Sequence, residues 1–357
     1  MPKYIGQITK CQICSNKSLT TILSLGHQPI VQEYLTAETL REPETTYPLN
    51  LARCNSCGLL QLDYIVDPKL VFPKNYPYRT GLTNMLIRNF RDLANTLFEK
   101  FKPSENDLII DIGSNDGTLL QGFKEKGMTV LGIEPTDAAK VANKNKIPTL
   151  QEFLNKKVVA KAVKKYGRAK FVTATNVFAH INNTKELISN IKNLLGKDGI
   201  FISESQYLMD IVEKFEFDTI YHEHLRFYSL KPLIKLHELG GLSIIDAERI
   251  SAAGGSIRVY AKRGKHPMSE RAKELITAEE KAGLYNEASL KDFADRAIKA
   301  KHALLALLIK CKTENAKIVG VGSPARSNTL LGFSNIDNNI LDYAFEKSGS
   351  PKIGLYT

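Results

Sequence analysis

The stretch Ile109-Ile110-Asp111-Ile112-Gly113-Ser114-Asn115-Asp116-Gly117 joins an apolar run to a turn that carries glycines and polar side chains. The apolar run predicts a buried strand, and the residues from Gly117 onward predict a helix. Glycines let backbone amides approach a ligand closely, and the N-terminus of the following helix adds a positive electrostatic end. The stretch therefore predicts a nucleotide-binding turn in an α/β fold.

A second acidic residue, Glu134, ends the next predicted strand, at a distance from the turn that suits a carboxylate binding ribose hydroxyls. The turn lacks the complete GxGxxG pattern, and a dinucleotide pyrophosphate would meet Asp116 unfavourably. The cationic methionine end of S-adenosylmethionine would not. We therefore favour S-adenosylmethionine over a dinucleotide, and over a turn that binds nothing. The expected cofactor residues are Asp111, Gly113, Asn115, Asp116, Gly117 and Glu134.

Strands and helices alternate on both sides of this turn. The predicted strands are 108–112, 129–133, 171–175 and 200–204, and the predicted helices are 85–101, 117–126, 136–145 and 184–195. Two further strands, 243–249 and 256–262, flank Gly254-Gly255 and are expected to form an antiparallel edge. This alternation predicts a parallel sheet that is covered by helices on both faces.

A second glycine turn, Gly320-Val321-Gly322-Ser323-Pro324-Ala325, lies between predicted strands at 316–321 and 340–345, and Glu346 ends the second strand. It is closer to a dinucleotide fingerprint than the first turn, although Pro324 removes an amide donor. A nicotinamide-linked enzyme and a turn that only shapes the fold both remain open for this unit. One strand–helix–strand unit cannot close a doubly wound sheet, so we expect a fragment or an unusually short chain.

Length and composition are typical of a soluble protein with two or three domains, at 357 residues, 43% hydrophobic and 24% charged. The N-terminus lacks a signal-peptide pattern, and the longest apolar run, Ala303–Ile309, is far shorter than the ~20 residues of a membrane span. We expect a cytoplasmic protein without membrane association. The net charge of +11 comes from scattered lysines, which argues against nucleic acid and suits an anionic small substrate such as a nucleotide sugar.

Four cysteines form two CxxC pairs, Cys11/Cys14 and Cys54/Cys57. Each pair can offer two thiolates from one tight turn, and two such turns complete a tetrahedral S4 zinc site. Residues 15–53 separate the pairs, so we expect a folded segment between the two turns. A cytosolic chain with paired CxxC motifs argues against disulfides, and we predict a closed, structural zinc site.

The stretch Phe217-Asp218-Thr219-Ile220-Tyr221-His222-Glu223-His224 ends with a phenol, two imidazoles and a carboxylate in consecutive positions. By itself it is compatible with a metal site, an acid–base cluster or a solvated turn. Because it follows a cofactor turn, we favour the acid–base cluster, in which an imidazole of near-neutral pKa moves a proton. A cofactor turn followed by such a cluster predicts an enzyme, and we favour a methyltransferase.

The order of these motifs resembles the S-adenosylmethionine-dependent nucleotide-sugar C-methyltransferases that act on 4-keto-deoxyhexoses. The resemblance covers essentially the whole chain and rests on the CxxC pairs, Tyr76-Pro77-Tyr78, the 112–117 turn, Asn176-Val177-Phe178-Ala179-His180, Tyr221–His224 and Gly254-Gly255-Ser256. It implies a zinc-ribbon-like domain over 1–75 and a Rossmann-type class I methyltransferase core over 76–265. A helical linker and a truncated C-terminal Rossmann-like unit would follow over 266–357.

The resemblance also implies roles for individual residues. His224 would be the general base that removes a proton from a ring carbon next to the sugar ketone. The other implied residues are Tyr76, Tyr221 and Glu223 in catalysis, Asn176 and His180 at the cofactor, and Tyr78, His222 and Ser256 at the substrate. Structural roles remain the alternative for His222, for His180 as a helix cap, and for Tyr76 and Tyr78 between domains.

Three positions depart from the family pattern. Ala253 stands where members usually have His, Gln32 replaces Asn in an early Pro-x-x-Asn, and the chain has Glu204-Ser205-Gln206-Tyr207 where members tend to have Glu-x-Pro-Tyr. These departures leave the sugar and the methylated atom open. Two alternatives follow: an O- or N-methyltransferase on a related sugar or nucleotide, or a zinc-ribbon RNA-binding protein whose methyltransferase fold is incidental.

Overall fold

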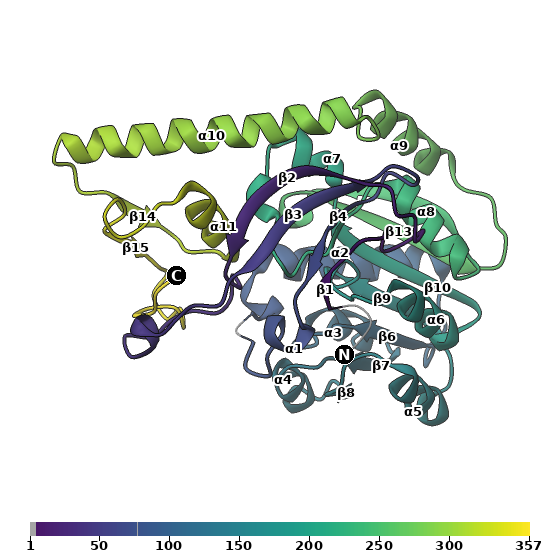
Figure 1. Ribbon diagram of the computed structural model, residues 1–357. Helices are drawn as coiled ribbons and strands as arrows, with labels where there is room; N and C mark the ends of the chain where they lie inside the picture. Colours follow the sequence, from purple (N-terminus) through teal and green to yellow (C-terminus); the bar gives the residue numbers. More distant parts are fainter. Residues whose placement is uncertain (1–4, 77) are drawn as a thin grey trace.

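The computed structural model describes residues 5–76 and 78–357, in which three regions lie side by side (Figure 1). An N-terminal sheet lies against a central core, and the long helix α10, Glu287–Thr313, leads from that core to a small C-terminal unit. Among the described residues, no helix is long and apolar enough to cross a membrane. Pro77, the middle residue of the predicted substrate segment, lies outside the described residues.

The central sheet has seven strands in the order β12-β13-β10-β9-β6-β7-β8. Their bounds are β6 Leu108–Ile112, β7 Thr129–Ile133, β8 Thr149–Leu150, β9 Ala169–Thr175, β10 Leu195–Gln206, β12 Leu242–Ile250 and β13 Ser256–Arg263. Only β13 runs antiparallel to the others, because it pairs antiparallel with both β10 and β12. This order, with one reversed strand inserted before the last, is that of Rossmann-like class I methyltransferases. The expected parallel sheet with an antiparallel edge is confirmed.

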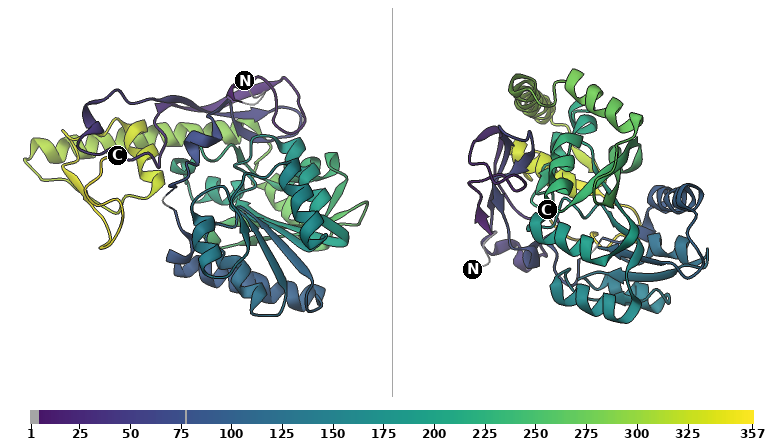
Figure 2. Two further views of the ribbon diagram at one scale, coloured as in Figure 1. Left: turned by 90° about the horizontal axis from the view of Figure 1, so that it is seen from below. Right: turned by 90° about the vertical axis from the view of Figure 1, so that its right-hand side faces the viewer.

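Helices cover both faces of the central sheet (Figure 2). They are α2 Asn84–Phe101, α3 Thr118–Lys124, α4 Ala138–Lys144, α5 Lys156–Tyr166, α6 Thr184–Leu194, α7 Leu208–Glu213 and α8 Leu230–Leu239. Successive residues of a strand point to opposite faces. Ile109 therefore packs in one cluster with Phe90 of α2, whereas Ile110 packs in the other with Ile188 of α6. The predicted helices are confirmed to within a few residues, and α5, α7 and α8 were not predicted.

The N-terminal sheet consists of β2 Leu19–Gln28, β3 Tyr47–Cys54, β4 Leu60–Leu62 and β11 Arg226–Phe227, in the order β11-β4-β3-β2. Strands β2 and β3 form the folded segment expected between the two CxxC turns. A separate short pair joins β1, Gly6–Gln7, to β5, Tyr64–Ile65. Strand β11 belongs to the core in sequence but completes the N-terminal sheet, so the segment after His224 is anchored in that sheet.

The C-terminal unit contains β14 Val319–Val321, α11 Ala325–Ser334 and β15 Tyr343–Phe345, with the two strands parallel. This is the predicted strand–helix–strand unit. The preceding helix α9, Glu270–Lys281, packs against β12 of the central sheet. Helix α11 contacts both β2 and the 3-10 turn Phe217–Thr219, which lies immediately before the histidine motif.

Candidate active site

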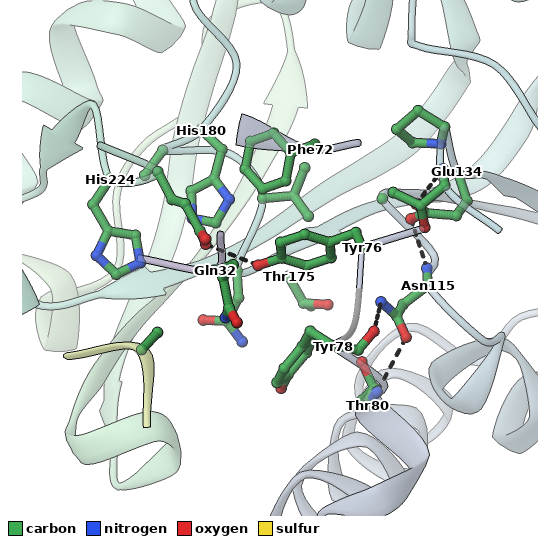
Figure 3. A pocket seen from close by; sticks show the side chains of 18 of the residues that line it. Gln32, Phe72, Tyr76, Tyr78, Thr80, Asn115, Glu134, Thr175, His180 and His224 are labelled. Atoms are coloured by element: carbon green, nitrogen blue, oxygen red, sulfur yellow. Dashed lines mark hydrogen bonds between the residues drawn. The ribbon is translucent and has the colours of Figure 1, made fainter. Parts of the chain in front are cut away.

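A cavity of about 1140 Å³ lies at the carboxyl ends of the parallel strands. The sheet order changes direction between β6 and β9, and open α/β sheets bind ligands at such a switch point. The cofactor turn after β6 forms one wall, the Tyr221–His224 motif forms another, and the N- and C-terminal regions contribute the rest. Figure 3 shows Tyr76 between the imidazoles of His180 and His224 on one side and Asn115 and Glu134 on the other.

The predicted glycine turn approaches its neighbours too closely for a side chain at Gly113. This residue has a φ of +69°, and its backbone N–H donates to the Ile133 carbonyl at 2.7 Å. A Cβ at this position would lie 2.3 Å from Cγ2 of Val177. Glycine is therefore required both for the backbone conformation and for the contact between the turns after β6 and β9.

The carboxylate of Glu134 is fixed in the cavity wall. Its Oε2 accepts from the Asn115 backbone N–H at 3.0 Å, and its Oε1 accepts from the N–H and hydroxyl of Thr136 at 2.9 and 2.6 Å. Asp111 lies beside it, accepts from the Thr173 hydroxyl at 2.7 Å, and has its pKa raised to about 7 by burial. Oε2 can accept one more hydrogen bond and Glu134 lines the cavity, which fits a hydroxyl donor of a ribose.

Asp116 and Gly117 have a different position from the one expected, because neither lines the cavity. The Asp116 carboxylate accepts from Gly81 N–H at 2.8 Å and from the Thr118 hydroxyl at 2.6 Å. Asn115 similarly accepts from Thr80 N–H at 3.0 Å. Asp116 therefore holds the 78–81 segment and the start of α3, while Asn115 contributes to both that segment and the cavity.

Asn176 and His180 both line the cavity after β9. Asn176 has a φ of +55° and donates its N–H to the Glu204 carbonyl at 2.8 Å. The His180 ring stacks on Phe72, with centroids 5.5 Å apart and planes at 11°, and lies 5.2 Å from the His224 ring. Burial lowers the pKa of His180 well below its usual value, so its ring is neutral. The ring packs between domains rather than capping a helix.

His224 has a defined tautomer. Its Nδ1 lies 2.7 Å from the Thr219 carbonyl, which can only accept, so Nδ1 carries the proton. Nε2 is therefore the unprotonated nitrogen of the neutral ring. Burial lowers the pKa of His224 to about 4, so this form dominates at neutral pH. One ring nitrogen is therefore held by a hydrogen bond, and the other can accept a proton.

Glu223 and Tyr76 form a buried pair beside this imidazole. The Tyr76 hydroxyl donates to Oε2 of Glu223 at 2.9 Å, and Oε1 is buried without a hydrogen-bond partner among the described residues. Burial raises the pKa of Glu223 to about 7 and, with the Glu223 charge, holds that of Tyr76 well above its usual value. Both groups can therefore carry protons in the cavity near neutral pH.

The remaining predicted residues divide between the cavity and its exterior. Tyr221 and Tyr78 line the cavity, and the Tyr221 ring lies 4.1 Å from that of His224. His222 does not line it: Nε2 lies 3.2 Å from the Pro48 carbonyl, and the ring packs against the N-terminal sheet. Ser256 is also outside, where its hydroxyl donates to Ala252 at 3.0 Å. Both residues therefore make packing contacts outside the cavity, and their predicted substrate contacts stay predictions.

Sequence reasoning did not identify Arg226, which lines the cavity and is 2% exposed. Its guanidinium donates to Gln12 Oε1 at 2.7 Å, and to the carbonyls of Phe178 at 3.1 Å and Ile181 at 2.5 Å. Gln12 lies between Cys11 and Cys14, so Arg226 joins the first CxxC turn to the loop that carries His180. No sequence signal marks this pairing, because the partners are far apart in the chain.

The three departures from the family pattern gather at the cavity. Ala253, Gln32 and Ser205-Gln206 all line it, although they come from three different segments. Ala253 has a φ of +52°, which is strained for a residue with a Cβ. The positions at which this chain departs from the pattern of the resembled family therefore line one cavity.

The four cysteines of the CxxC pairs come together as predicted. Their Sγ atoms all lie within 4.8 Å of one another, with Cys11–Cys57 and Cys14–Cys54 each 3.5 Å apart. Zinc–sulfur bonds of about 2.3 Å would separate tetrahedral sulfurs by roughly 3.8 Å, so the cluster fits zinc. The site is structural, because four protein thiolates leave no open position for a substrate.

Comparison with known proteins agrees with this architecture. Three family models match in succession: "Putative zinc binding domain" at 11–72, "Methyltransferase domain" at 84–247 and "C-methyltransferase C-terminal domain" at 251–357. The third begins before the expected boundary at 266 and includes β13. The C-methyltransferase NovU of Streptomyces niveus is 28% identical over 334 residues, which cover 93% of this chain and 79% of that protein.

Solved structures with a similar fold include an S-adenosylmethionine-dependent methyltransferase from Clostridium acetobutylicum, 13% identical, with a TM-score of 0.39 over 50% of this chain and 92% of that one. Another is magnesium protoporphyrin IX methyltransferase from Synechocystis with bound SAH, 15% identical, with a TM-score of 0.39 over 50% and 84%.

The sheet order, the cavity with its glycine turn and fixed Glu134, and the matching methyltransferase domain define an S-adenosylmethionine-dependent methyltransferase. Its flanking zinc-binding and C-terminal domains narrow the class further. These domain matches, together with the similarity to the C-methyltransferase NovU, support a C-methyltransferase.

Proposed function

We propose that the protein methylates a ring carbon next to the ketone of a nucleotide-linked keto-deoxysugar, with His224 as the general base. The observation that carries this proposal is the hydrogen bond from His224 Nδ1 to the Thr219 carbonyl, at 2.7 Å. It leaves Nε2 unprotonated in a cavity that also contains the cofactor turn. A base is needed because a carbon next to a ketone is only weakly acidic.

The chain's own residues handle the proton and the developing negative charge. His224 Nε2 takes the proton when the carbon–hydrogen bond breaks. S-adenosylmethionine, when bound, would supply the methyl group, and the new carbon–carbon bond would form as the sulfur–methyl bond breaks. The ketone oxygen becomes an enolate oxygen, which a hydrogen-bond donor in the cavity stabilises. Protonated Glu223, with its unpartnered Oε1, is the donor that we assign to this oxygen, and Tyr76 orients the carboxyl group.

Residues of the C-terminal unit that line the cavity support the proposal that the sugar carries a nucleotide. The C-terminal unit contributes residues 346–352 there, including Lys347, Lys352 and two serines. Lys352 Nζ lies 3.6 Å from Glu346 and 2.5 Å from the Ser323 carbonyl, so it is held at the cavity. Ammonium and hydroxyl groups are suitable donors for a diphosphate.

The test is deuterium exchange at the sugar carbon. Zinc-loaded protein is incubated in D2O with a dTDP-linked 4-keto-6-deoxyhexose and S-adenosylhomocysteine, and the sugar is followed by NMR. We expect exchange next to the ketone, and a mass gain of one methyl group when S-adenosylmethionine replaces its product. The His224→Ala variant should lose both while binding S-adenosylmethionine normally by calorimetry.

Two outcomes would contradict the proposal. Methyl transfer without deuterium exchange would indicate an O- or N-methyltransferase. Exchange at the wild-type rate in His224→Ala, in protein that still binds cofactor, would exclude His224 as the base.

A further inference from the structure

Helix α11 of the C-terminal unit contacts the segment that precedes the histidine motif. Arg326, Thr329 and Phe333 follow one another at a spacing of three and four residues, which places them on one face of the helix. This face lies against Glu216–Ile220, and the Thr219 carbonyl of the same segment carries the His224 contact. The segment therefore contacts both the C-terminal unit and the imidazole.

Each of the three side chains makes a specific contact. Arg326 donates to both carboxylate oxygens of Asp218, from Nε at 2.8 Å and from Nη2 at 2.5 Å. The Thr329 hydroxyl donates to the Ile220 carbonyl at 3.4 Å. The Phe333 ring meets Phe217 edge to face, with centroids 5.9 Å apart. A forked pair between arginine and carboxylate fixes orientation as well as distance.

The turn transmits this constraint to the imidazole over one residue. Thr219 follows Asp218 directly, is 1% exposed, and donates both its N–H and its hydroxyl to the Glu216 carbonyl, at 3.1 and 2.8 Å. Its own carbonyl is the acceptor for His224 Nδ1. A shift of Asp218 would therefore move the atom that sets both the tautomer and the direction of the His224 ring.

We propose that Arg326 is a positioning residue for His224, acting through Asp218 and the Thr219 carbonyl. This inference rests on the proposed role of His224 as the base. It gives the C-terminal unit a part in proton transfer, because α11 orients the base without touching the reacting atoms. The turnover of the methyltransferase core then depends on α11 being docked.

The positive charge of Arg326 and the burial of His224 both lower the pKa of His224. The titratable and charged groups around His224 are His180, Glu216, Asp218, Tyr221, Glu223, Arg226 and Arg326. Burial is the main cause of the lowered pKa of His224, and the cationic Arg326 lowers it further. Removal of the cation should therefore raise this pKa from about 4 toward the ordinary 6.5.

The direct test measures the tautomer and the titration of the His224 ring, and it needs no substrate. Zinc-loaded protein labelled with 15N-histidine is titrated by NMR, and the His224 signals are assigned by their absence in His224→Gln. We expect wild type to show protonated Nδ1 and bare Nε2, with a midpoint near 4. Arg326→Ala should show a mixture of tautomers and a higher midpoint. Arg326→Lys keeps the positive charge but cannot form the paired hydrogen bonds to Asp218. It should show mixed tautomers, with the midpoint of the His224 titration nearly unchanged.

Arg249 offers a matched control. It donates to both oxygens of Asp210, at 3.0 and 2.8 Å, and its side chain is 34% exposed against 35% for Arg326. It does not line the cavity. Arg249→Ala should leave the His224 tautomer and midpoint unchanged, which separates a specific effect from the loss of any surface ion pair.

In the exchange assay we expect Arg326→Ala to lower the rate about 10- to 100-fold, as for a misplaced catalytic group, with cofactor affinity unchanged. Asp218→Asn, which removes the ion pair but keeps the shape, should have the same effect if Arg326→Ala does not fold. A wild-type tautomer and midpoint in a folded Arg326→Ala or Asp218→Asn protein would overturn the proposal. If wild type catalyses no exchange, the proposed function fails, while the NMR result still decides whether Arg326 positions His224.

Discussion

Replacement of Gly113 by alanine tests the geometry of the cofactor turn most directly. Two costs add at this position. A residue with a Cβ at a φ of +69° carries roughly 1–2 kcal/mol of backbone strain. The Cβ would also lie 2.3 Å from Val177 Cγ2 and 2.9 Å from Cγ1, and such overpacking costs typically 1–3 kcal/mol. We expect a destabilisation of about 2–5 kcal/mol.

Gly127→Ala is the matched control for this substitution. Its φ of +85° imposes the same kind of strain, but the nearest atom to an added Cβ is Glu105 Cγ at 3.5 Å, an ordinary contact. The control should therefore lose only about 1–2 kcal/mol. The difference between the two variants isolates the clash with Val177.

The assays are denaturant unfolding of zinc-loaded protein and calorimetric titration with S-adenosylmethionine. Gly113→Ala should weaken cofactor binding at least tenfold, or about 1.4 kcal/mol, because relief of the clash moves the turn after β6 away from that after β9. Gly127→Ala should bind normally. Equal destabilisation of the two variants, or normal cofactor affinity in Gly113→Ala, would refute the packing argument.

Two further predictions concern pH and zinc. The exchange rate should have an acid limb near pH 4, where His224 becomes protonated, and a basic limb near 7, where Glu223 loses its proton. Glu223→Gln should remove only the basic limb, because an amide donates at every pH; an unaltered profile in that variant would exclude Glu223 as the donor. Metal analysis should show that Cys54→Ser has lost zinc. This variant should also lose deuterium exchange, because Gln12 no longer supports Arg226. It should still bind the cofactor, because the cofactor site lies on the core. Full exchange activity in metal-free Cys54→Ser protein would contradict this structural role.

Most local elements of the core could be predicted from the sequence. The helical spacing of Leu86, Phe90, Leu93 and Leu97 marked α2, and all four residues are buried. The strand and glycine turn at 109–117 indicated the cofactor site, because a turn of this kind is encoded by adjacent residues. The CxxC pairs indicated the metal site for the same reason, since each CxxC turn is a local structure that needs two cysteines at this spacing.

The sequence could not predict which histidine of the Tyr221–His224 motif faces the cavity. His222 and His224 are two residues apart and would share a face in a strand. They lie in a turn instead, where the His224 N–H donates to the Tyr221 carbonyl, and their rings diverge toward the N-terminal sheet and the cavity. Asp116 similarly turns away from the cavity to hold Gly81, a partner that no local pattern indicates.

The sequence by itself determined the class I core, the four-cysteine site and the strand and glycine turn at 109–117, because each is specified by residues close together in the chain. Only the tertiary structure decided which side chains surround His224 and the cavity. Arg226 reaches Gln12, β11 completes the N-terminal sheet, and Arg326 reaches Asp218. These contacts join segments about one hundred or more residues apart, and they exist only because the packing of three regions closes the chain around one cavity.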